Sequence, residues 1–168
     1  MPRRNTTAAI TAGFVGWLLM TIWIYTGRYL GLPKTDIAKM IGGSVTGTKP
    51  MMVAWMSTAW WYGMVIHFVL GTIVFALVYL YVVLPMVNWS PIVSGLFWGL
   101  VLWVVFETVI LKAMGVGFLY PRTAAHPLAW VIEVVVAHII YGLFLGYVYA
   151  AMVPAVNRTA TPIQPATV

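Results

Sequence analysis

The fold is decided by residues 60–87, which read WWYGMVIHFVLGTIVFALVYLYVVLPMV. This run has no acidic residue, no lysine and no arginine, and it is longer than the roughly 20 residues with which an α-helix crosses a bilayer. Residues 8–32, 91–118 and 127–153 form three more runs of the same kind. A spanning sheet would have to close into a barrel, so long continuous runs favour helices. The sequence therefore predicts four membrane-spanning helices.

The composition points to the same class of protein. The chain is 62% hydrophobic and 7% charged, whereas a soluble domain carries roughly 25% charged residues. The fold class expected is an all-α polytopic membrane four-helix bundle, with residues 1–168 as one membrane domain. The chain has no cysteine, which excludes disulfides, thiolate metal sites and a cysteine nucleophile. The net charge of +6 lies mostly near the ends of the apolar runs, where membrane topology and anionic headgroups explain it better than nucleic acid.

The connections between the runs differ in length. Residues 88–90 are too few to join the second and third helices except as an antiparallel hairpin. Residues 34–58 form the one long loop, in which apolar positions within 37–41 are spaced i, i+3, i+4. This spacing predicts a short amphipathic helix on the membrane surface, ended by the glycine pair at 42–43. The polar segment 154–168 is predicted to be a flexible tail.

The two halves of the chain resemble each other. His67 precedes Gly71 by four residues in the second run, and His138 precedes Gly142 by four in the fourth. The first and third runs both end with a basic residue three positions before a glycine. These matches predict an internal repeat of two similar helical hairpins, related by an axis along the membrane normal. Such an axis would place the two imidazoles at similar depth, facing the centre of the bundle.

Few ionisable residues lie within the runs, and any such residue in a membrane span is a candidate functional group. The set comprises His67, His138, Glu107 and Glu133, with Arg28 and Lys112 nearer the ends. Glu133 is five residues before His138, about 140° around the helix, so both cannot face one centre. The structural interpretation has the histidines hydrogen-bonded to Glu107 or to backbone carbonyls, Glu133 paired with Lys112 or Arg122, and Arg28 and Lys112 extended to the headgroups.

Three functional interpretations compete with the structural one. His67 and His138 are suited to axial ligation of haem b, with Gly71 and Gly142 leaving room for a flat ligand. His67, His138 and Glu107 also form a donor set that suits a non-haem metal. The third interpretation is a proton or ion path, of which histidine and glutamate side chains within a membrane are typical.

Short motifs run through most of the chain: GLPKTDIA at residues 31–38, HFVLG at 67–71, MGVGF at 114–118, and a His-x3-Gly-x3-Gly series at 138–146. In these motifs the chain resembles a family of small bacterial four-helix integral membrane proteins of unknown function. The resemblance implies a location in the bacterial inner (cytoplasmic) membrane. It implies no substrate, cofactor or catalytic residue.

The expected function is that of a non-catalytic integral membrane subunit or accessory protein, partnered by the lipid bilayer and by other membrane subunits or copies of itself. No catalytic residue is predicted, because the sequence lacks a phosphate-binding loop, an HExxH motif and a nucleophile elbow. A haem-b electron carrier and a small transporter or ion conduit are the alternatives. Nucleic acid is not an expected partner.

Overall fold

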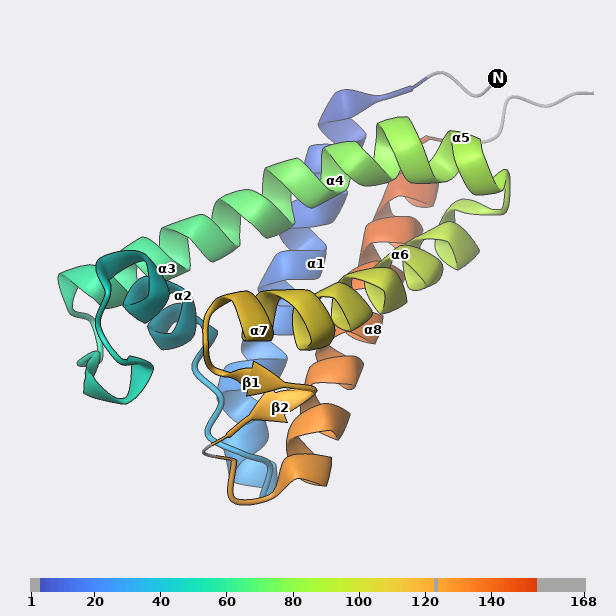
Figure 1. The fold of residues 1–168 in the computed structure, drawn as a ribbon. Coiled ribbons are helices and arrows are strands. Elements are labelled where there is room, and N and C mark those ends of the chain that lie inside the picture. The colour runs from blue at the N-terminus through green and yellow to red at the C-terminus, as the bar shows by residue number, and fades with distance from the viewer. Residues whose placement is uncertain (1–3, 123, 154–168) are drawn as a thin grey trace, which may run out of the picture.

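The computed structural model describes residues 4–122 and 124–153, and it is almost entirely helical (Figure 1). Four helical segments are long and apolar enough to cross a membrane: Thr6–Leu30, Thr58–Val87, Pro91–Ala113 and Pro127–Met152. They are called the first to fourth spans below. All four predicted spans are confirmed as helices of this kind. The tail predicted at 154–168 lies outside the described residues.

Three of the spans are built from several helical pieces. The bounds are α1 (Thr6–Gly27) and η1 (Arg28–Leu30) in the first span; α3 (Thr58–Val69), η3 (Leu70–Val74), α4 (Phe75–Val78), η4 (Tyr79–Val83) and α5 (Leu84–Val87) in the second; α6 (Pro91–Val105), η5 (Phe106–Ile110) and α7 (Leu111–Ala113) in the third; and α8 (Pro127–Met152) in the fourth. The segments η3, η4 and η5 are π-helical turns. Such turns within α-helices occur frequently at functional sites.

Side-chain caps fix where the spans begin. The Asn5 side chain accepts a hydrogen bond from the Ala8 amide at the start of α1. Ser57 caps α3 and Ser90 caps α6 in the same way. These residues satisfy amides that have no partner within the helix. Asn88, with φ of 51°, closes α5 and turns the chain directly into the third span.

The third span is shorter than predicted. The sequence suggested a helix through residue 118, but the helix ends at Ala113 and Gly115 follows with φ of 68°. The chain then forms a small antiparallel hairpin of β1 (Gly117–Phe118) and β2 (Tyr120–Pro121). A left-handed glycine ends the helix because the other residue types adopt that conformation at a steric cost.

The helix predicted in the long loop is present as α2 (Ile37–Thr46), followed by η2 (Pro50–Met52). The expectation that it ends at Gly42-Gly43 was wrong, because it continues to Thr46 and is capped by Gly47. The two glycines serve packing instead. A Cβ on Gly42 would collide with the Ala59 carbonyl, and one on Gly63 would collide with the Ala38 carbonyl. Helices α2 and α3 therefore pack with their backbones in direct contact.

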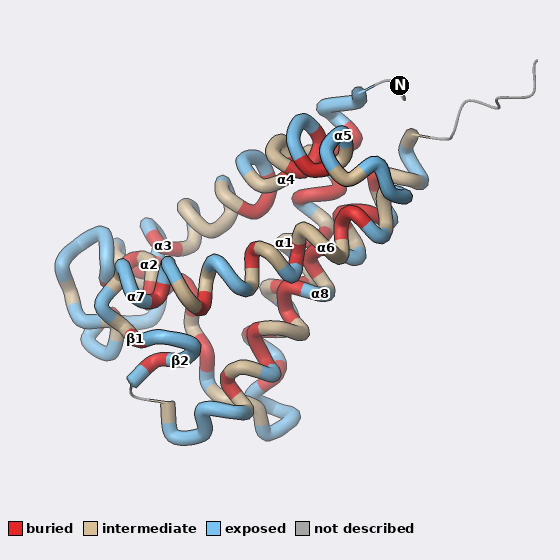
Figure 2. Tube along the Cα trace, turned by 45° about the vertical axis from the view of Figure 1, so that its right-hand side comes forward, coloured by how far each residue is buried: buried red, intermediate tan, exposed pale blue. Residues whose placement is uncertain are grey.

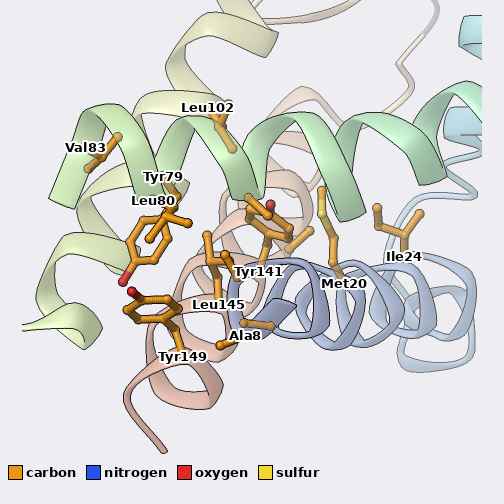
Figure 3. Close-up of a cluster of buried hydrophobic side chains, with 14 residues drawn as sticks. Ala8, Met20, Ile24, Tyr79, Leu80, Val83, Leu102, Tyr141, Leu145 and Tyr149 are labelled. Atoms are coloured by element: carbon orange, nitrogen blue, oxygen red, sulfur yellow. The ribbon is translucent and has the colours of Figure 1, made fainter. Parts of the chain in front are cut away.

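The fourth span holds the bundle together. Helix α8 packs along both α1 and α6, and α1 also contacts η3 and α4. Buried residues are concentrated where these helices face one another (Figure 2). A cluster of large side chains fills this region, including Tyr79, Tyr141, Leu145 and Tyr149 (Figure 3). The main contacts between the second and third spans lie near their connecting turn, which leaves space between α3 and α6 further along.

Candidate functional site

That space is a cavity of about 480 Å³ bounded by all four spans and by α2. Its lining is almost wholly apolar, it includes both His67 and His138, and it is partly open to the molecular surface. Pockets for small molecules in proteins are typically about 300–1,000 Å³, mostly apolar, with a few placed polar groups. The cavity has this character.

His67 lies on α3, three residues before the π-helical turn η3. The indole Nε1–H of Trp17 donates a hydrogen bond of 3.1 Å to its Nδ1. An indole N–H can only donate, so Nδ1 carries no proton. In the neutral ring the proton is on Nε2, which makes Nε2 of His67 a hydrogen-bond donor.

The hydrogen bond of His138 fixes the opposite tautomer. Its Nδ1 lies 2.8 Å from the carbonyl oxygen of Val134, one turn earlier on α8. A carbonyl only accepts, so Nδ1 carries the proton, and Nε2 of the neutral ring is an acceptor. The side chain is only 8% exposed, and the Phe106 ring lies beside it with a centroid separation of 6.0 Å. Within the described chain, neither Nε2 atom makes a hydrogen bond.

The predicted cofactor-binding residues divide into two groups. Gly71 lines the cavity together with the two histidines. Gly142 does not, because it packs against α6, where an added Cβ would collide with the Gly95 carbonyl and lie 3.1 Å from Gly99 Cα. Gly142 therefore brings α8 close to α6 rather than making room for a ligand.

A haem held by both imidazoles does not fit this arrangement. A ligating histidine binds through one ring nitrogen and donates the N–H of the other to a carbonyl, carboxylate or water. His138 meets this condition through Val134. His67 does not, because its Nδ1 receives a hydrogen from Trp17 and its Nε2 then carries the ring proton.

Glu107 is fully buried but lies outside the lining of the cavity. Its Oε1 accepts a hydrogen bond of 3.2 Å from Trp130 Nε1, while Oε2 has no partner. Across residues 4–122 and 124–153, no three His, Cys, Asp or Glu side chains are placed to hold a metal ion. The structure thus does not bring His67, His138 and Glu107 together as a metal site.

We expect Glu107 to stabilise the fold through the hydrogen bond that its carboxylate accepts from Trp130. Glu107→Gln keeps a side-chain oxygen that accepts from the indole, so the melting temperature in detergent should stay near that of the wild type. Glu107→Leu leaves a buried N–H without a partner, at a cost of about 1–3 kcal/mol, and should melt clearly lower. Equal melting of the two variants would show that this hydrogen bond does not contribute to stability.

Glu133 is fully buried as well. The expected ion pair with Lys112 or Arg122 is wrong: both basic residues are exposed, and the carboxylate accepts a hydrogen bond from the Thr35 hydroxyl. Thr35 itself lines the cavity, so Glu133 is one hydrogen bond behind the cavity wall.

The basic residues expected near the span ends are found there. Arg28 is exposed at the end of the first span, with its guanidinium 4.9 Å from the centre of the Tyr29 ring. Lys112 is exposed in α7, at the end of the third span. Neither residue lines the cavity.

Two residues of the site were missed by sequence reasoning. Trp17 supplies the N–H that sets the tautomer of His67, and the Tyr141 hydroxyl donates a 2.7 Å hydrogen bond to the Gly71 carbonyl. Trp17 lies in the middle of a span, where an indole N–H needs a partner in the protein, and that position was the available signal.

Four apolar spans around a histidine-containing cavity define an integral membrane helical protein. The profile of DUF6789, a family of unknown function, matches residues 3–159. The chain belongs to this family. No curated protein and no solved structure matches the chain.

Proposed function

We propose that the protein is a non-catalytic integral membrane accessory protein that binds a small, largely apolar molecule in the cavity between α3 and α6. We further propose that it resides in the bacterial cytoplasmic membrane and works with other membrane subunits or with copies of itself. One observation carries the binding proposal: two imidazoles line a largely apolar cavity of about 480 Å³, and each leaves Nε2 without a partner in the described chain.

A purely structural role explains the hydrogen bond at Nδ1 of each histidine, but it does not explain why Nε2 has no partner in the described chain. Trp17 and Val134 satisfy the two Nδ1 atoms. Both histidines line one cavity, and a ligand that pairs with the two Nε2 atoms accounts for the other nitrogen of each ring.

The hairpin repeat is part of this proposal. The histidine of the second span is bonded to Trp17 of the first, and the histidine of the fourth lies beside Phe106 of the third. Each histidine therefore contacts the preceding span of its own hairpin. This agreement supports two related hairpins that each contribute one imidazole to a shared ligand site.

Photolabelling tests the binding proposal. A twelve-carbon alkyl diazirine is added to the protein in lipid nanodiscs, activated by light and mapped by mass spectrometry. We expect saturable labelling at Ile66 and Leu102, which line the cavity and are less exposed than the flanking surface residues. Labelling restricted to the exposed neighbours Val65 and Val104, which do not line it, would contradict a cavity site.

The accessory role has a separate test. Membranes are extracted with a mild detergent, and intact complexes carrying the chain are weighed by native mass spectrometry. We expect a stoichiometric complex with other membrane chains or with further copies. A chain that is recovered only as a monomer, at several detergent concentrations, would contradict this part of the proposal.

A further inference from the structure

We propose that the cavity selects a neutral, largely apolar ligand that carries a hydroxyl group. The hydroxyl oxygen accepts a hydrogen bond from Nε2–H of His67, and the hydroxyl hydrogen is donated to Nε2 of His138. This inference rests on the proposed binding function and specifies the chemistry of its ligand.

The two imidazole rings are in complementary tautomeric states. Trp17 donates to Nδ1 of His67, and the Val134 carbonyl accepts from Nδ1 of His138. One ring consequently offers a donor to the cavity and the other an acceptor. A hydroxyl group both donates and accepts, so it matches the donor of one ring and the acceptor of the other. An ether or a ketone only accepts and would leave His138 without a partner.

The other side-chain donors in the lining already have hydrogen-bond acceptors within the protein. The hydroxyl of Thr35 donates to Glu133, that of Ser44 to the Met40 carbonyl, and that of Tyr141 to the Gly71 carbonyl. The indole N–H of Trp17 is bonded to His67. The imidazole Nε2 atoms are therefore the polar groups of the lining that are free to recognise a ligand.

The lining contains no lysine, arginine, aspartate or glutamate. A carboxylate or an ammonium group placed there would lose its hydration without gaining a countercharge, and burial of an unpaired charge is strongly unfavourable. The aromatic rings of Trp17, Phe75 and Phe106 complete an apolar wall that suits the hydrocarbon body of the ligand.

Competition for the photolabel tests this inference. 1-Dodecanol, dodecyl methyl ether, laurate and dodecylammonium are titrated against labelling of Ile66 and Leu102 in nanodiscs. We expect the alcohol to displace the label at a concentration at least tenfold lower than the ether or either ion. Equal potency of alcohol and ether would overturn the hydroxyl inference while leaving the binding site in place, whereas the absence of cavity labelling would remove both.

Two variants connect the preference to the rings. His138→Phe removes the acceptor, so the alcohol should lose its advantage over the ether although the label still reaches the cavity. Trp17→Phe keeps both imidazoles but frees Nδ1 of His67, and it should weaken the preference for the alcohol without abolishing labelling. Trp17→Phe also provides the test if the His138→Phe variant does not fold. An unchanged tenfold preference in a folded variant would contradict the assignment of these groups.

Discussion

Replacing Gly142 with leucine should force α8 away from α6 and lower the stability of the protein by about 3 kcal/mol or more. An added Cβ at this position would collide with the Gly95 carbonyl, and Gly99 Cα lies 3.1 Å away. The obstacle is backbone on the facing helix, which cannot rotate aside as a flexible side chain can. The change would also displace His138, which lies one turn earlier on α8.

The measurement is thermal unfolding in detergent, with Ala151→Leu as the matched control. Ala151 lies on the same helix and is exposed, so the same side chain added there should leave the melting temperature nearly unchanged. If the two variants melt together, the close contact between α6 and α8 is not a determinant of the fold.

Replacing Val105 with tryptophan should abolish ligand binding while leaving the helices in place. Val105 lines the cavity, and a tryptophan there would occupy part of its roughly 480 Å³. We expect photolabelling of Ile66 to fall at least tenfold. The cavity is partly open to the surface, so the fold should tolerate a larger side chain here better than at a fully enclosed position.

Val104→Trp is the control for this prediction. Val104 is adjacent in α6, is 47% exposed and does not line the cavity. Labelling of Ile66 in this variant should match that of the wild type. If both tryptophan variants label normally, the photolabel does not occupy the cavity between α3 and α6.

The four spans could be predicted because hydropathy alone determines which segments cross a membrane. The end of the third span could not, since it depends on the left-handed conformation of Gly115. The end of α2 was missed for a different reason. Glycine pairs usually weaken a helix, but Gly42 is retained within α2 because its lack of a side chain allows contact with α3.

The site was predictable in outline only. The matched His-x3-Gly motifs pointed to His67 and His138, and both line one cavity. The equivalence of Gly71 and Gly142 failed, because one borders the cavity while the other packs against Gly95 and Gly99. The bond between Trp17 and His67 joins residues 50 positions apart, and no local pattern encodes such a contact.

Nitrogen-15 NMR of the histidine rings, in protein reconstituted into lipid, shows which ring nitrogen carries the proton in each histidine. The chain has three histidines, and a His126→Gln variant leaves the two cavity residues. We expect two neutral rings of opposite tautomer, with the proton on Nε2 in His67 and on Nδ1 in His138. Two rings of the same tautomer, or a doubly protonated ring at neutral pH, would contradict this assignment.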